Sequence, residues 1–173
     1  MSRVDAEKDA SRILLTIWAP GNTSLTTIPI PVDPVLIAKR LGIETFEVEL
    51  DPNVSGALIK RVGRDPSILL NEKDSDNRKR FSCAHELGHF VRRSNLMQGS
   101  EEYEYVDLRG PLASTGENAD EVYANQFGAA LLMPGDCVVD FWKDGKSPID
   151  LQFAFEVSAD AMENRLRSLR LQR

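Results

Sequence analysis

The segment "RFSCAHELGHF" at residues 80–90 constrains the fold more than any other part of this chain. Its apolar residues recur every three to four positions, which predicts a helix over residues 76–94. His85 and His89, four residues apart, would then lie on one face of the helix, one turn apart, where both imidazoles can bind one metal ion. Glu86 would lie about 100° further round the helix axis, beside the ion, where a base can take a proton from an activated water.

A helix that merely carries two surface histidines is the alternative interpretation, because short patterns also occur by chance. Two observations favour the metal site. The chain has two histidines in total, and both lie in this segment. Gly88 lies between them although glycine costs a helix about 1 kcal/mol relative to alanine, which suggests close approach of another backbone or a bound peptide.

A catalytic zinc ion takes three protein ligands and leaves one position for water, so a third ligand is needed. The best source is the helix predicted over residues 117–133, "ENADEVYANQFGAALLM". We favour Glu121 over Glu117, because Glu121 lies inside the helix and Glu117 near its start, where an acidic residue also favours the helix dipole. Both share a face with the small residues Ala124 and Gly128, which would allow two helices to pack closely.

The sequence also offers other candidates for the third metal ligand. Asp120 is a further carboxylate in the same segment, and Cys137 follows the proline that ends the helix. Cys83 would point away from the metal-binding face of its helix, so we expect a small buried side chain there.

The rest of the chain predicts an α+β fold in which a small, three-stranded, mostly antiparallel sheet packs against helices. Expected strands are 45–50, 57–62 and 67–72. The third could pair with an extended substrate, or be an ordinary internal strand. Residues 95–116 are polar and glycine-rich, and we expect a long loop that could act as a lid.

Further helices are expected near both ends of what we interpret as a single domain over residues 1–173. An N-terminal helix and connector would occupy residues 1–30. A short helix would begin after Asp33, as N-cap, and end at Gly42. The tail, residues 146–173, has helix-turn-helix-like spacing, with Ser158 capping its second helix, and its apolar stripe predicts packing against the domain.

Composition excludes several classes of protein. The net charge is −6, from 21 basic and 27 acidic residues, which disfavours direct DNA binding through a broad basic face. No apolar run approaches the roughly 18 residues of a membrane span. Two cysteines are too few for a disulfide framework. The N-terminal segment lacks a convincing cleavage site, so we expect a cytoplasmic protein.

Two motifs together resemble the ImmA/IrrE family of zinc metallopeptidases. They are the HExxH segment of residues 85–89 and "EVYANQFGAALLMP" at residues 121–134, which is similar to the family's ExxAN-x-F…LLMP helix. The similarity extends over about residues 30–171. One departure is Ala130, where the family often has an acidic residue.

The resemblance implies a minimal zincin-like domain that binds one Zn²⁺ per chain, although the ligand set would accept other divalent metals. It implies that His85, His89 and Glu121 are the ligands and Glu86 the general base. It also implies a protein substrate, since members of the family cleave helix-turn-helix repressors of phages, mobile elements or stress regulons. The expected activity is therefore that of a zinc-dependent endopeptidase.

Peptide hydrolysis also needs a second electrophile for the carbonyl oxygen, and no histidine is left to supply it. Candidate residues with a hydrogen-bond donor are Tyr103, Tyr105, Arg109, Tyr123 and Asn125. The alternative function is a non-proteolytic protein, an anti-repressor or toxin-system partner, that binds a regulator and holds a structural metal. Such a site would normally be closed by a fourth protein ligand.

Overall fold

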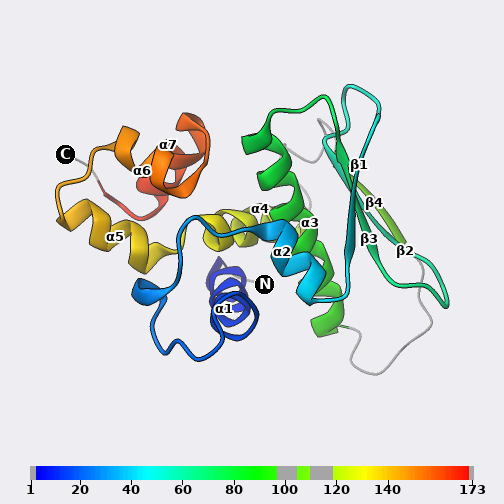
Figure 1. Cartoon of the computed structure of the whole chain (residues 1–173), viewed down its shortest axis with the longest axis horizontal. Coiled ribbons are helices and arrows are strands. Elements are labelled where there is room, and N and C mark those ends of the chain that lie inside the picture. The colour runs from blue at the N-terminus through cyan, green and yellow to red at the C-terminus, as the bar shows by residue number, and fades with distance from the viewer. Residues whose placement is uncertain (1–2, 97–104, 110–118, 172–173) are drawn as a thin grey trace.

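The structure is a computed structural model that describes residues 3–96, 105–109 and 119–171. A long helix, α3 (Asp76–Leu96), lies between a sheet on one side and further helices on the other (Figure 1). The helices on the side away from the sheet include α1 (Arg3–Ile13) and α4 (Ala119–Leu132). The predicted α+β class is confirmed, and α3 and α4 carry the two motifs on which the metal site depends.

The sheet has four strands in the order β1-β3-β2-β4. These are β1 (Glu44–Val48), β2 (Gly56–Lys60), β3 (Ser67–Asn71) and β4 (Tyr105–Arg109). β3 pairs in parallel with β1 and antiparallel with β2, and β2 pairs antiparallel with β4. The sheet is therefore mixed, and β3 is internal. The hypothesis that the third strand accepts a substrate strand is wrong, because both of its edges are already paired.

One face of the sheet packs against α3. Leu58 of β2 and Ile68 of β3 are cross-strand partners on this face, and both are fully buried. At the rim of this face Lys79 of α3 donates to Glu47 of β1, with Nζ 2.8 Å from Oε2. Burial of these apolar side chains holds the sheet against the helix that carries both histidines.

The helices before the sheet begin and end as the sequence indicates. The side chain of Asp33 accepts hydrogen bonds from the first turn of α2 (Pro34–Arg40), at 2.9 Å from the nitrogen of Val35. Gly42 follows the helix with a φ of +76°, a left-handed conformation that glycine adopts without strain. The chain before α2 contains α1, a π-helical turn at Leu14–Trp18 and a 3₁₀ turn at Leu25–Thr27.

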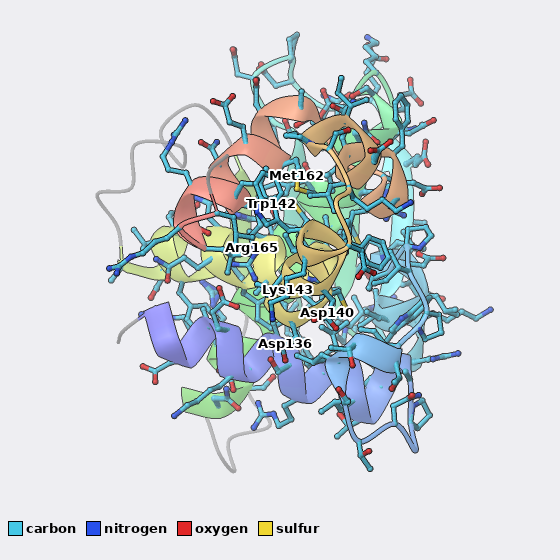
Figure 2. All side chains as sticks on the ribbon, turned by 90° about the vertical axis from the view of Figure 1, so that its left-hand side faces the viewer. Asp136, Asp140, Trp142, Lys143, Met162 and Arg165 are labelled. Carbon is cyan, nitrogen blue, oxygen red and sulfur yellow. The ribbon has the colours of Figure 1, made fainter. Side chains whose placement is uncertain are left out.

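Three helices follow α4: α5 (Gly135–Lys143), α6 (Pro148–Phe155) and α7 (Ala159–Ser168). The predicted cap of the last helix is confirmed, since the Ser158 hydroxyl accepts from the backbone nitrogen of Ala161 at 3.2 Å. Figure 2 shows this end of the molecule, where Arg165 of α7 lies close to α5 and faces α1. Arg165 is buried, and its Nη2 lies 3.0 Å from Oε2 of Glu7 on α1, so an ion pair fixes the tail to the N-terminal helix.

Two elements depart from the sequence expectation. β4 lies inside the segment expected to be a loop, and α5 begins directly after the Pro134-Gly135 pair interpreted as a helix end. Pro134 does end α4, but its position also serves as the N-cap of α5. β4 is short and gains its hydrogen bonds from β2, which lies nearly fifty residues earlier in the chain.

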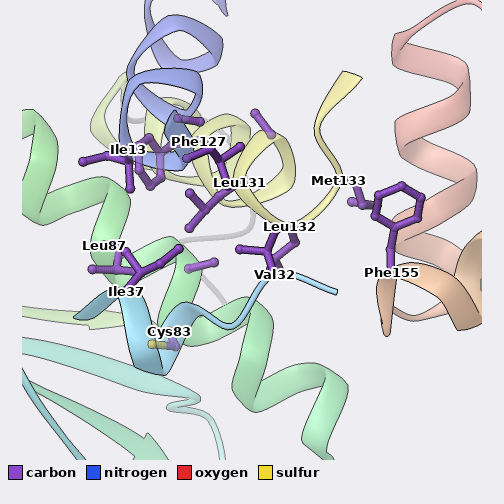
Figure 3. Packing of buried hydrophobic residues seen from close by; sticks show 14 of the residues in the cluster. Ile13, Val32, Ile37, Cys83, Leu87, Phe127, Leu131, Leu132, Met133 and Phe155 are labelled. Atoms are coloured by element: carbon purple, nitrogen blue, oxygen red, sulfur yellow. The ribbon is translucent and has the colours of Figure 1, made fainter. Parts of the chain in front are cut away.

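The main apolar core fills the space between α1, α2, α3 and α4 (Figure 3). Leu87 of α3 and Phe127 and Leu131 of α4 are fully buried at its centre, with Ile37 of α2 beside them. The core therefore joins the two motif helices directly. Among the described helices, none combines the length and apolar character needed to cross a membrane.

Candidate metal centre

His85 and His89 both lie on the buried side of α3, with exposed fractions of 1% and 3%. Their Nε2 atoms are 3.0 Å apart and face the same point, and the two rings meet edge to face. The i,i+4 spacing of the motif therefore produces the convergence that the sequence predicted. The interpretation as two surface histidines does not fit this burial.

Glu121 reaches the same point from the first turn of α4. Its Oε1 lies 3.1 Å from Nε2 of His89, and its Oε2 lies 3.3 Å from Nε2 of His85. In a tetrahedral zinc site with bonds of about 2.0–2.1 Å, two donor atoms lie about 3.3 Å apart. The three side chains thus fit a shared zinc ion in both donor chemistry and spacing. Within the described ranges, this metal-compatible cluster consists of these three residues.

The Glu121 carboxylate is ionised at neutral pH. Its partial burial acts to raise the pKa, but its close contacts with the imidazoles of His85 and His89 outweigh that effect and lower the pKa to about 2. A metal ligand must be deprotonated to donate an electron pair, so the carboxylate is in its binding form before any ion arrives.

Two glycines allow α3 and α4 to approach closely enough for this geometry. A Cβ on Gly88 would lie 2.9 Å from Cα of Ala124, closer than real Cβ atoms come. A Cβ on Gly128 would lie 3.2 Å from the backbone nitrogen of His85. Gly88, which is costly in a plain helix, is therefore explained by the backbone of α4, and the small residues Ala124 and Gly128 have the packing role that the sequence indicated.

Arg92 fixes the start of α4 to α3. Its Nη2 lies 2.5 Å from Oδ1 of Asp120, and its Nη1 donates to the carbonyl of Ala119 at 3.0 Å. The guanidinium carbon also lies 5.1 Å from the centre of the Tyr123 ring. Glu121 lies between these contacts, so Arg92 restrains the turn that carries it. Sequence reasoning missed Arg92, because its partners are brought to it only by helix packing.

Glu86 is buried on the side of α3 that faces β2, with an exposed fraction of 1%. A Cβ on Gly56 of β2 would lie 3.4 Å from Oε1 of Glu86 and 3.4 Å from Cβ of Ser82. Gly56 therefore lies directly over the carboxylate, with space for no more than an ordinary contact between them. Sequence reasoning also missed Gly56, since nothing in the strand pattern indicates what lies beneath it.

Two of the candidate electrophiles have defined partners. The Tyr123 hydroxyl donates to Oδ2 of Asp9 on α1 at 2.6 Å, and burial together with this hydrogen bond raises the pKa of Tyr123. Tyr123 thus belongs to the packing between α1 and α4. The Oδ1 of Asn125 lies 3.0 Å from Nδ1 of His85, on the opposite side of the imidazole from Glu121.

Other candidates lie elsewhere or outside the described residues. Glu117 and Tyr103 are outside them. Cys137 is buried on α5, its thiol donates to the Leu25 carbonyl at 2.8 Å, and burial raises its pKa to about 11. Cys83 is also buried, with a pKa raised mainly by burial, and neither thiol belongs to the histidine cluster.

Comparison with known protein families places these helices in context. The sequence profile of the IrrE N-terminal-like domain, peptidase family M78, matches residues 38–167, about three quarters of the chain. The chain belongs to this family. Both motif helices and the whole histidine–glutamate cluster fall inside the matched range. A comparison with curated proteins gave no match.

Membership of this M78 family supports a metallopeptidase-type function, and the family's peptidase activity suggests a protein substrate. The cluster of His85, His89 and Glu121 is compatible with a metal site of the kind such an activity requires. The resemblance drawn from the paired motifs is therefore confirmed at the level of the family.

Proposed function

We propose that this protein is a zinc-dependent endopeptidase in which His85, His89 and Glu121 hold the metal and Glu86 is the general base. The observation that carries the proposal is the convergence of three side chains from two helices, whose nitrogen and oxygen atoms lie 3.0–3.3 Å apart. Three protein ligands leave a coordination position open, which is typical of catalytic rather than structural zinc sites.

Zinc, when bound, would supply a Lewis acid that polarises the peptide carbonyl and lowers the pKa of water. Glu86 then takes the proton from the attacking water and delivers it to the nitrogen of the leaving amine. Its burial beneath Gly56 supports this role, because the strand keeps bulk water away from the carboxylate that handles the proton. Glu121 stays ionised and binds the metal without competing for this proton.

For the second electrophile we favour Arg109. In the register of the sheet Arg109 of β4 pairs with Gly56, the residue directly above Glu86, whereas Tyr105 pairs with Lys60 at the far end of the strand. Arginine carries a fixed cationic group of the kind that stabilises a developing oxyanion. Tyr123 is committed to Asp9 and does not suit this role.

The substrate that we propose is a helix-turn-helix transcriptional repressor of a phage, mobile element or stress regulon, cleaved in the cytoplasm. This step depends on the family resemblance. Direct DNA binding by the tail is disfavoured, because Asp160 and Glu163 are exposed at the start of α7, where a recognition helix would face phosphates and bases. Of the two basic residues of α7, Arg165 is buried in the ion pair with Glu7, and Arg167 is exposed and pairs with Glu163 at 3.3 Å.

Co-expression with a repressor encoded beside this gene tests the proposal. We expect the wild type to cleave the repressor and Glu86→Gln to leave it intact with an unchanged zinc content. Glu163→Gln, the same change at an exposed position of α7, is the matched control and should cleave normally. Equal relief of repression by the wild type and Glu86→Gln, without cleavage, would instead establish the non-proteolytic alternative.

A further inference from the structure

His85 is held at both ring nitrogens by one face of α4. Nε2 lies 3.3 Å from Oε2 of Glu121, and Nδ1 lies 3.0 Å from Oδ1 of Asn125. Asn125 follows Glu121 by four residues, so the two side chains project from the same face of the helix one turn apart. Two residues of one helix, Glu121 and Asn125, therefore contact the imidazole from opposite sides.

The contact at Nδ1 decides where the ring carries its proton. An amide oxygen can only accept a hydrogen bond, so Nδ1 must be the protonated nitrogen of the neutral ring. Nε2 then carries the lone pair, and it is Nε2 that faces Glu121 and His89. Without an acceptor at Nδ1, the neutral ring could place its proton on Nε2, where Glu121 would accept it and the lone pair would point away from the cluster.

The short separation of α3 and α4 suits the length of the Asn125 side chain. Gly128 brings the backbone of α4 to within contact of the His85 backbone, since a Cβ there would lie 3.2 Å from its nitrogen. At so short a helix separation the two-carbon side chain of asparagine reaches Nδ1 directly. The same close packing that delivers Glu121 to the cluster thus delivers Asn125 to the opposite edge of the ring.

We propose that Asn125 is a positioning residue that selects the Nδ1–H tautomer of His85 and thereby presents the Nε2 lone pair to the metal. It acts through His85 and does not touch the substrate, in contrast to the sequence-based suggestion that it stabilises the transition state. The inference rests on the proposed metal site. Partners of this kind typically change metal affinity by about 10–100-fold.

Two substitutions separate this role from simple packing. Asn125→Leu keeps the size of the side chain and removes the acceptor, whereas Asn125→Asp keeps an oxygen that accepts from Nδ1–H. Gln126→Leu is the matched control, because it makes a similar change at the next position, about 100° further round the same helix. If Asn125→Leu does not fold, Asn125→Ala removes the same acceptor without a branched side chain.

Zinc affinity, measured by competition with a chromophoric chelator, is the first readout. We expect Asn125→Leu to bind zinc about 10–100-fold more weakly, with Asn125→Asp and Gln126→Leu close to the wild type. The second readout is the tautomer of His85 in the metal-free protein at a fixed, mildly alkaline pH, from long-range ¹H–¹⁵N NMR spectra. With two histidines in the chain, one His89→Gln variant assigns the signals.

The wild type should show the Nδ1–H tautomer at His85, and Asn125→Leu a shift toward Nε2–H. An Asn125→Leu protein with unchanged zinc affinity and an unchanged tautomer would overturn the inference while leaving the peptidase proposal intact. An Nε2–H tautomer in the wild type would also overturn it, because the amide would then donate to Nδ1. A wild type that binds no zinc would instead refute the proposed function, and the tautomer would still test Asn125.

Discussion

Gly88→Ala is the substitution that most directly tests the packing beneath the metal centre. In an exposed helix this change would stabilise the protein by about 1 kcal/mol, because alanine is the better helix former. In α3 the new methyl group would instead meet the backbone of α4, 2.9 Å from Cα of Ala124 and 3.2 Å from Cβ of Phe127. Backbone atoms cannot rotate away as a flexible side chain does.

The size of the effect follows from the overlap. Ordinary contact begins at 3.4 Å, so the helices must separate locally by about 0.5 Å. Overpacking of this kind costs about 1–3 kcal/mol, which the gain of about 1 kcal/mol in helix propensity reduces to a net loss of about 0–2 kcal/mol. Glu121 lies one turn before Ala124, and metal sites tolerate displacements of about 0.2 Å. We therefore expect zinc to bind at least about tenfold more weakly.

Urea unfolding of the metal-free protein measures the loss of stability, and a chelator competition titration measures the loss of zinc affinity. Gly135→Ala is the matched control, since a Cβ there finds its nearest neighbour at 3.4 Å, far from the histidines, and should change neither value appreciably. A Gly88→Ala protein that is more stable than the wild type and binds zinc equally well would refute the argument that close helix packing positions Glu121.

Three further predictions address other contacts. Arg165→Leu removes the buried ion pair with Glu7 and should lower the free energy of unfolding by about 2–3 kcal/mol in urea titrations, less than for a fully buried partner because Glu7 is partly exposed. A change below 0.5 kcal/mol would contradict the role assigned to this pair. Tyr123→Phe removes the hydrogen bond to Asp9 and should cost about 1–2 kcal/mol of stability in the same assay, with zinc affinity and kcat retained. If Tyr123→Phe lost most of its kcat at normal stability, Tyr123 would again be a candidate for the group that stabilises the oxyanion. Arg109→Ala should lower kcat about 10²–10³-fold at unchanged zinc affinity, and full activity in this variant would exclude Arg109 from catalysis.

Much of the candidate site could be predicted from local sequence. The spacing of His85 and His89 implies a shared helix face, and the position of Glu86 beside them follows from the same geometry. Glu121 could be ranked above Glu117 from its place within a helix, and Asn125 lies four residues further along that same face. Such inferences are possible because the period of an α-helix is fixed by its backbone hydrogen bonds and does not depend on the rest of the fold.

The fold was predictable to a similar extent. The prediction failed where an element depends on partners that are distant in the sequence. β4 is five residues long and exists through its pairing with β2, and α5 reuses the proline that ends α4 as its own cap. Neither feature has a strong local signal. The sheet is likewise mixed because β3 lies between β1 and β2. This strand order depends on how the strands pack together and does not follow from the lengths of the turns that connect them.

The sequence by itself determined which residue types lie on each helix face and hence which donor atoms can meet a metal. Only the tertiary structure decided the separation and register of α3 and α4, which bring Glu121 to within 3.1–3.3 Å of both imidazoles and Asn125 to the far side of His85. Helix faces follow from a local periodicity of 3.6 residues. The distance between two helices depends on which side chains interdigitate, here two glycines and an alanine, and that is known only once both helices are packed.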